Sequence, residues 1–214
     1  MSSYTKSLPW CDIVIDDKAI LLQQKWFYTW VSVAGVGGWT ENEKRAFHSR
    51  AEKYILASWS NRARMEVTGT SDFAKKHAGK QMPFLLDVRW VLANAHWSVT
   101  VTKIPKTAFL TSSIVWDSRL INLDTNDFST RVNCDPAPPA CFKQTPVAHE
   151  FGHALGNTVI KGRGDEYHDS SPHRGDNSSI MNIGNQLRVR HFQTIIEELN
   201  LMIPNANFSV KAIG

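Results

Sequence analysis

One segment of the chain combines residue types and a spacing that could hold a metal ion and use it. His149, Glu150 and His153 form an HExxH sequence. On a helix, histidines four residues apart project from one face and can share one ion. Zinc accepts imidazole nitrogens, and a catalytic zinc site has three protein ligands and a water molecule. Glu150 lies beside the same face, where it could take a proton from that water and deliver it to a leaving amine.

The residues around this sequence favour a helix of about residues 146 to 155. Thr145 is a good N-cap, and Pro146 suits the first helical position because its missing N–H costs nothing there. Gly156 is placed to end the helix with a left-handed backbone. We therefore expect the HExxH sequence on a short helix with defined ends.

The sequences HEFGHALG (149–156) and SSIMN (178–182) together resemble the metzincin clan of zinc metallopeptidases. The resemblance covers residues 145 to about 200. It implies a zinc ion, a third protein ligand that follows the active-site helix, and a turn containing a methionine beneath the metal. Met181 is placed like that methionine, so the resemblance gives it a structural role as a hydrophobic floor.

The third ligand is where this chain departs from the metzincin pattern. In that pattern the ligand comes three residues after the glycine, and here that position is Val159, which cannot bind a metal. We interpret residues 157–164 as an insertion that lengthens the turn, so that Asp165 of a displaced Asp-Glu-Tyr sequence takes the third position. His168 is the main alternative, because imidazole is an equally good zinc ligand. Four more residues are weaker alternatives: Glu166, Asp169, His173 and Asp176.

The resemblance also implies how a substrate would bind. In the clan, a strand ahead of the zinc helix forms the edge of the cleft and pairs with an extended peptide. Residues 119–124, RLINLD, are the candidate for that strand. Tyr167 could stabilise the oxyanion of the tetrahedral intermediate through its hydroxyl, or could simply pack against its own loop.

The elements that must position these residues begin with a clear helix over residues 39–59. Thr40 and Glu43 have capping-box spacing. The residues that fall on one face of this helix are Phe47, Ala51, Tyr54, Ile55 and Ser58. Strands are expected over residues 12–15, 64–70, 83–92, 96–104 and 118–124, whereas residues 19–33 could form a helix or a strand.

A proline-rich loop is expected over residues 133–144, ahead of the HExxH helix. Cys134 and Cys141 lie within it and could pair or remain free thiols, and with Cys11 the count of cysteines is odd. Residues 185–204 predict an amphipathic helix that packs beneath the methionine turn. Its apolar stripe consists of Val189, Phe192, Ile195, Ile196 and Leu199, and Pro204 ends it.

These elements predict an α+β fold in one domain, residues 1–214, with a small mixed sheet and a helix packed on it. A cleft at the HExxH helix would separate an upper part, about residues 1–156, from a lower part, about residues 157–214. The lower part would hold the third ligand, the methionine turn and the terminal helix. The length and the 42% hydrophobic composition are ordinary for one globular domain with its own core.

The composition gives little reason to expect a nucleic acid or a membrane as partner. The net charge is +4 with basic residues spread along the chain, so we interpret the densest group, Arg188, Arg190 and His191, as a solvated face. For His191 itself we expect a structural role. We expect no membrane span and no signal peptide of the usual kind, which leaves a cytoplasmic protein or one exported by another route. The oligomeric state is not predicted.

The function expected from these observations is that of a zinc metallopeptidase, which hydrolyses peptide bonds in a protein or peptide substrate with Glu150 as the general base. Two alternatives stay open. The substrate could be a cell-wall peptide, as for an exported effector. The zinc could instead stabilise a binding module without turnover, although such a module would have no need of Glu150.

Overall fold

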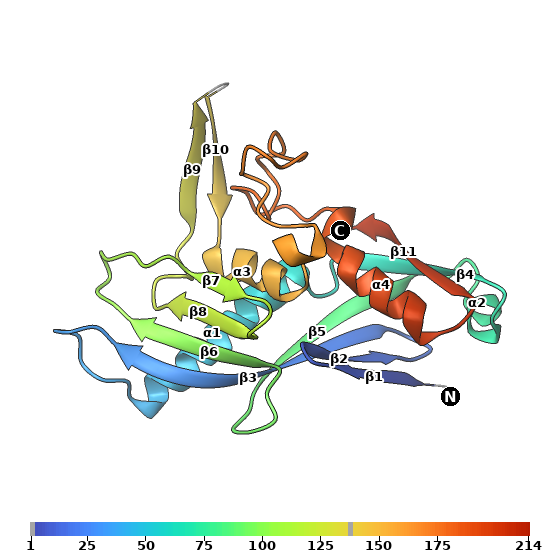
Figure 1. Ribbon diagram of the computed structural model, residues 1–214, viewed down its shortest axis with the longest axis horizontal. Coiled ribbons are helices and arrows are strands. Elements are labelled where there is room, and N and C mark those ends of the chain that lie inside the picture. The colour runs from blue at the N-terminus through green and yellow to red at the C-terminus, as the bar shows by residue number, and fades with distance from the viewer. Residues whose placement is uncertain (1–2, 137–138) are drawn as a thin grey trace.

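The computed structural model describes residues 3–136 and 139–214 as an α+β fold (Figure 1). The strands are β1 Tyr4–Leu8, β2 Cys11–Ile15, β3 Ile20–Ser32, β4 Ala63–Gly69, β5 Met82–Trp90, β6 Trp97–Lys103, β7 Ser113–Val115, β8 Leu120–Asp124, β9 Arg131–Pro136, β10 Pro139–Gln144 and β11 Ala206–Ile213. The α-helices are α1 Glu41–Trp59, α2 Asp72–Lys76, α3 Pro146–Ala154 and α4 Gln193–Met202, with short 3₁₀ helices at Val159–Lys161 and Val189–Phe192.

Nine of the described strands form one mixed sheet, in the order β11-β4-β5-β3-β6-β8-β7, with β2 paired to β3 and β1 paired to β2. Strand β3 pairs with β2, β5 and β6 and so connects the parts of this sheet. Buried residues alternate with more exposed ones from Ile20 to Tyr28, the pattern of a strand rather than of a helix. The first half of β3 pairs with antiparallel β2 and parallel β5, and the second half pairs with parallel β6. The expected mixed sheet is confirmed, and residues 19–33, left open between helix and strand, contain its longest strand.

Helix α1 begins as predicted, at a capping box in which Thr40 and Glu43 bond each other's backbone amides. Its buried residues are Phe47, Ala51, Ile55 and Trp59. This face packs against β5 and α3, and the helix crosses behind the strands in Figure 1. None of the helices in the described chain is long and apolar enough to cross a membrane.

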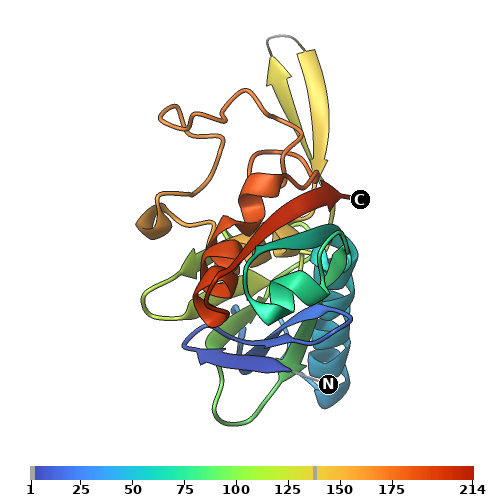
Figure 2. The ribbon, with the colours of Figure 1, turned by 90° about the vertical axis from the view of Figure 1, so that its right-hand side faces the viewer.

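The segment 133–144 is a β-hairpin and not the predicted loop. Strands β9 and β10 pair in register, and Cys134 lies directly across from Cys141, to which it is joined by a disulfide. The hairpin projects away from the rest of the chain (Figures 1 and 2). Residues 137–138, which include one of the prolines that suggested a loop, are outside the described residues.

The C-terminal region also differs from the expectation of one helix over residues 185–204. A 3₁₀ turn at Val189–Phe192 precedes α4, which spans Gln193–Met202, and residues before it form loop. The chain then continues into β11, which the sequence did not suggest and which pairs with β4 at the far edge of the sheet. The apolar stripe is partly buried, because Phe192, Ile195 and Leu199 lie in the core whereas Val189 is half exposed.

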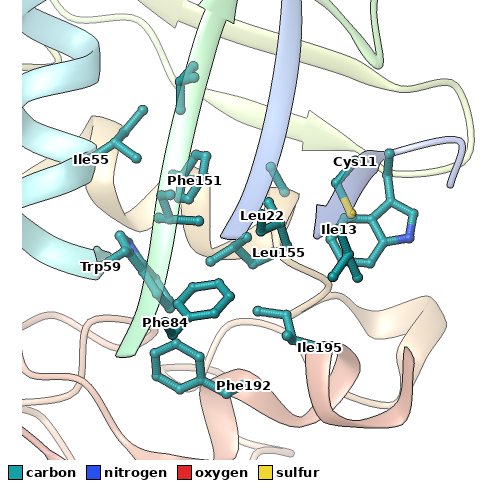
Figure 3. Close-up of a cluster of buried hydrophobic side chains, with 14 of the residues drawn as sticks. Cys11, Ile13, Leu22, Ile55, Trp59, Phe84, Phe151, Leu155, Phe192 and Ile195 are labelled. Atoms are coloured by element: carbon teal, nitrogen blue, oxygen red, sulfur yellow. The ribbon is translucent and has the colours of Figure 1, made fainter. Parts of the chain in front are cut away.

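The core brings side chains of α3 together with those of α1, α4 and the sheet (Figure 3). Phe151 of α3 packs near the rings of Trp26 and Trp59, and Phe192 packs edge-on against Phe84 of β5. These side chains are almost fully buried. Burial of each such ring contributes about 1.5–3 kcal/mol, and the contacts of Phe151 fix α3 against β3 and α1.

Candidate metal centre

Helix α3 carries the HExxH sequence and spans Pro146–Ala154, in agreement with the predicted helix. Thr145 occupies the N-cap position, as predicted, although its side chain makes no capping bond. Its backbone carbonyl instead accepts from the amides of Ala148 and His149. Gly156 follows the helix with φ of +96°, in the positive-φ region that favours glycine.

Two buried side chains tie α3 to its neighbours through backbone carbonyls. The indole N–H of Trp59 donates to the carbonyl of Ala148 at 2.8 Å, and the amide of Gln24 donates to the carbonyl of Ala154 at 2.8 Å. Gln24 is a fully buried polar residue on β3, where an unpaired amide would be costly. These two bonds fix the height and rotation of the helix that bears the histidines.

His149 and His153 each use one ring nitrogen to bond a backbone carbonyl. Nδ1 of His149 lies 2.7 Å from the carbonyl oxygen of Ile180, and Nδ1 of His153 lies 2.5 Å from that of Asn157. A carbonyl can only accept, so in both rings Nδ1 carries the proton and Nε2 keeps its lone pair in the neutral form. This is the tautomer that a metal ligand requires, held by the kind of outer contact that orients ligating histidines.

Asp165 completes the group. Its Oδ1 lies 3.0 Å from Nε2 of His149 and 3.1 Å from Nε2 of His153. Burial opposes ionisation of this carboxyl, but added protons on the two imidazoles would be donated to it, and that interaction holds the pKa of Asp165 well below its usual range. One potential ligand atom from each of the three residues lies within 4.8 Å of the others.

The other candidates for third ligand lie outside this group. His168 is mostly exposed, and its Nε2 is 3.8 Å from the second carboxylate oxygen of Asp165. Asp169 is exposed and pairs with Arg174. Glu166 and Asp176 both form ion pairs with Arg190. The described contacts of His173 are made by its backbone.

The donor set of the three residues fits a metal ion. The two Nε2 atoms and Oδ1 of Asp165 are all acceptors in these protonation states, and three converging acceptors repel one another unless a cation or added protons lie between them. Two imidazoles and one carboxylate are also a common ligand set for a metal site in proteins. His149, His153 and Asp165 could therefore hold a metal ion.

Glu150 lies beside the group and lines the same cleft, which has a volume of about 450 Å³. Burial raises the pKa of its carboxyl, and the nearby histidines partly oppose that shift. The remaining lining residues come from three segments: 111–116, 158–160, and the group of Gly164, Asp165 and Tyr167. Tyr167 is among them, with its ring stacked near His149, and burial together with the Asp165 carboxylate raises the pKa of its hydroxyl.

The strand at the edge of this cleft is β7 and not the segment 119–124. Strand β8, which contains most of that segment, is paired on both sides, with β6 and with β7. Strand β7 pairs with β8 alone among the described strands and lines the cleft. Strand β7 was not predicted, because three residues are too few to show an alternating pattern.

Met181 is fully buried in a tight turn against α3. A Cβ atom at position 152 would lie 2.4 Å from Sδ of Met181 and 2.8 Å from Cζ2 of Trp59, so Gly152 is what lets these side chains touch the helix. The backbone of the turn is also used, because the carbonyl of Ile180 holds His149 and that of Met181 accepts from the amide of Glu166 at 2.8 Å. The turn thus connects a histidine with the residue after Asp165.

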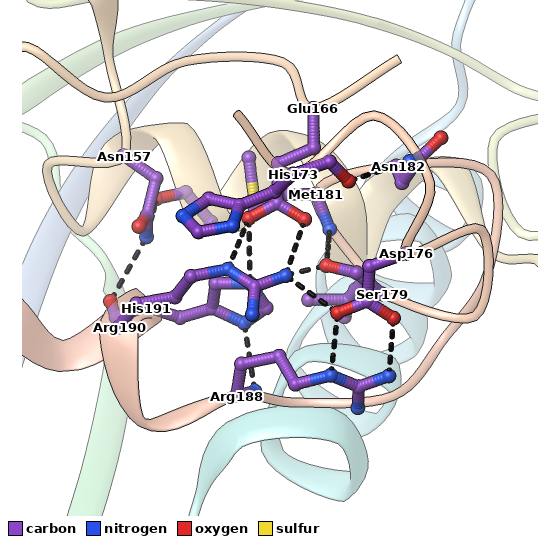
Figure 4. Close-up of polar contacts among 12 residues, drawn as sticks. Asn157, Glu166, His173, Asp176, Ser179, Met181, Asn182, Arg188, Arg190 and His191 are labelled. Carbon is purple, nitrogen blue, oxygen red and sulfur yellow. Dashed lines mark hydrogen bonds and ion pairs between the residues drawn. The ribbon is translucent and has the colours of Figure 1, made fainter. Parts of the chain in front are cut away.

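A polar cluster below this turn holds the irregular chain between residues 162 and 188 (Figure 4). Arg190 bonds the carboxylate of Glu166 through two nitrogens, at 2.6 and 2.8 Å, and bonds Asp176 at 2.6 Å. Arg188 makes a second two-point contact with Asp176. His191 accepts the amide of Arg188 at Nδ1, so its Nε2–H donates toward Ser179 or Glu166.

The interpretation of Arg188, Arg190 and His191 as a solvated face is therefore wrong for the arginines, which bind buried and partly buried carboxylates. The expected structural role of His191 agrees with its complete burial. Sequence spacing could not reveal the partners, since Glu166 and Asp176 precede Arg190 by 24 and 14 positions.

Asn157 and Gln144 are two further residues that the sequence analysis missed. The side chain of Asn157 donates to the backbone carbonyls of Gly152 and His191, and the backbone carbonyl of Asn157 accepts from Nδ1 of His153. The Gln144 amide, at the foot of the hairpin, lies 3.1 Å from Nδ1 of His149 and donates to the carbonyl of Asn182. Both residues adjoin the ends of the HExxH helix, and that position is the one signal that could have singled them out.

Three kinds of comparison with known proteins give no relative. No protein-family model, no curated protein and no solved structure matches the chain.

Proposed function

We propose that this protein is a zinc-dependent metallopeptidase that hydrolyses peptide bonds with Glu150 as the general base. The observation that carries the proposal is the convergence of Nε2 of His149, Nε2 of His153 and Oδ1 of Asp165 beside the Glu150 carboxyl in one cleft. Metal ligands that only stabilise a fold need neither a cleft nor a neighbouring base.

Zinc is the metal that best suits the ligands. Two neutral imidazoles and one carboxylate form a three-ligand set typical of catalytic zinc, which keeps a further position for water or substrate. Calcium and magnesium favour sites made of oxygen atoms and so fit two histidines poorly. The backbone carbonyls of Ile180 and Asn157 would keep both rings oriented toward the ion.

A bound zinc ion would lower the pKa of a water molecule and polarise the carbonyl of the bond to be cleaved. Glu150 would take the proton from the water and pass it to the leaving amine, a role suited to a carboxyl whose pKa is raised by burial. The free edge of β7 could bind an extended peptide through backbone hydrogen bonds. Tyr167 could donate its hydroxyl proton to the developing oxyanion.

Zinc content and hydrolysis together test the proposal. The purified protein should contain one equivalent of zinc after growth with zinc present, and should cleave denatured casein. Peptidoglycan assayed in parallel would show whether a cell-wall peptide is the substrate instead. Zinc well below one equivalent in folded protein would overturn the proposal.

The Glu150→Gln variant separates an enzyme from a zinc-stabilised binding module. The variant should retain zinc, because Glu150 is not one of the three potential ligands. Its turnover should fall about 100- to 10,000-fold, because Gln cannot act as a base. The matched control is Glu52→Gln on α1, a residue that is not among those lining the cleft, and this change should leave turnover intact. Equal behaviour of Glu150→Gln and wild type in every assay would favour the binding module.

A further inference from the structure

The segment between Gly156 and Asp165 forms a turn that hydrogen bonds hold in place. The hydroxyl of Thr158 caps a 3₁₀ turn at Val159–Lys161, and the carbonyl of Thr158 accepts the amide of Arg163 at 2.9 Å. Gly162 adopts φ of +70° to close it. The guanidinium of Arg163 then bonds Thr194 and Glu197 on α4. The chain is therefore held at both ends of the turn.

This turn presents two apolar side chains to solvent. Val159 is 81% exposed and Ile160 is 59% exposed, yet both border the cleft that contains the three potential metal ligands and Glu150. Isolated exposed apolar residues are common and need no explanation. Here, however, Val115 of β7 and Tyr167 are also exposed and line the same cleft. Apolar surface from three segments that gathers beside one site indicates a binding surface.

The charges of the cleft restrict what could lie there. Among the residues that line it, the carboxylates of Glu150 and Asp165 and the two histidines beside them are the ionisable groups near the metal centre, together with the Tyr167 hydroxyl. The wall formed by Val159 and Ile160 of the turn offers neither an ion pair nor a side-chain hydrogen bond. A charged substrate side chain placed against this wall would lose hydration without a partner, whereas an apolar one would gain from burial.

We infer that Val159 and Ile160 select peptide substrates with an apolar side chain next to the bond that is cleaved. The inference rests on the proposed function and adds a substrate class to it. A peptide extended along β7 would direct successive side chains to opposite faces of the sheet, and one of those on the face toward the turn would meet the wall that the turn forms. The residues that displace the third ligand along the chain thus also supply the specificity.

Cleavage-site profiling of a peptide library by mass spectrometry tests this inference. Wild-type protein should favour apolar over charged residues at one position beside the cleaved bond. The Val159→Ser/Ile160→Ser double variant should lose about 10-fold of that preference, expressed as a ratio of kcat/KM values, while it keeps its zinc. Leu92→Ser is the matched control, because Leu92 is 83% exposed but lies outside the lining of the cleft.

Two outcomes overturn the inference: a wild-type profile without an apolar preference, or a double variant with an unchanged profile. Hydrolysis accompanied by either outcome leaves the proposed function standing. If wild type hydrolyses nothing, the subsite is tested by measuring how tightly the same peptides bind to the Glu150→Gln protein. An apolar preference in binding that Ile160→Ser removes supports the subsite independently of turnover, and equal binding of apolar and charged peptides overturns it.

Discussion

The guanidinium of Arg190 donates hydrogen bonds to both carboxylate oxygens of Glu166, at 2.6 and 2.8 Å, and Glu166 directly follows Asp165. Glu166 is almost fully buried, and hydrogen bonds from Arg190 and other neighbours hold its pKa at about 2 against the opposing effect of burial. The amide of Glu166 also donates to the carbonyl of Met181. The residue after Asp165 is thus fastened through both its side chain and its backbone.

Loss of this ion pair should weaken metal binding. Arg190→Met leaves a buried carboxylate without its partner, which should cost about 3–5 kcal/mol of folding free energy. Arg190→Lys keeps the charge but not the two-point contact, so it should fold and bind zinc about 10- to 100-fold more weakly. Zinc affinity is measured by chelator competition and stability by urea denaturation. Arg174→Ala, which breaks an exposed pair with Asp169, should change either quantity little. If Arg190→Lys bound zinc as tightly as wild type, the inference that the pair of Arg190 and Glu166 positions Asp165 would be contradicted.

The close contact at Gly152 predicts a cost for the smallest possible substitution. Alanine normally favours a helix over glycine by about 1 kcal/mol. At residue 152, however, the added Cβ would overlap Met181 and Trp59, so Gly152→Ala should destabilise the protein by about 1–3 kcal/mol. Thermal denaturation measures the change. Gly175→Ala, where a Cβ meets nothing within 4 Å, is the control, and equal stability of the two variants would refute the packing argument.

Removal of the metal should lower the stability of wild-type protein, because a ligand that binds the folded state stabilises it. At a free zinc concentration about 100 times the Kd, the stabilisation is about 2.7 kcal/mol. The zinc-dependent rise in Tm should disappear in His153→Ala and Asp165→Ala. It should persist in His168→Ala, whose side chain is mostly exposed and lies outside the three-residue group. A loss in His168→Ala with retention in Asp165→Ala would reverse the assignment of the third ligand.

Asp127 should make stability depend on pH. Burial raises its pKa to about 7, against hydrogen bonds from the Ser112 hydroxyl and the Asp124 amide and the charge of Arg131, while the charge of Asp124 adds to the rise. In the unfolded chain its pKa is about 3.9, so between about pH 4 and pH 7 the folded state binds the extra proton. Stability from this group is complete below pH 4 and is lost as pH rises to 7.

The Asp127→Asn variant isolates that effect, because its side chain does not titrate. The difference in unfolding free energy between variant and wild type, followed by urea denaturation from pH 4 to 8, should shift in favour of the variant as pH rises. Ser112→Ala, which removes a bond to the carboxylate at 2.6 Å, should extend the slope to higher pH. Parallel curves for Asp127→Asn and wild type would show that Asp127 titrates normally.

Local physics explains what could be predicted from the sequence. The capping box at Thr40 and the helix Pro146–Ala154 depend on residues three or four positions apart, and so does the shared face of His149 and His153. Segments without such local signals were not predicted. The hairpin β9–β10 depends on cross-strand pairing, and β11 depends on β4, which lies far away in sequence.

The choice among candidates for the third ligand shows the same division. From the sequence, both Asp165 and His168 followed the HExxH helix closely enough to complete a metal site. The path of the chain after Gly156 depends on contacts across long separations, such as Arg163 with Glu197 and Glu166 with Arg190. Residue types and local spacing therefore determined that a metal site could form on this helix. The tertiary structure decided that Asp165 meets the two histidines, because ion pairs distant in sequence hold the backbone that carries it.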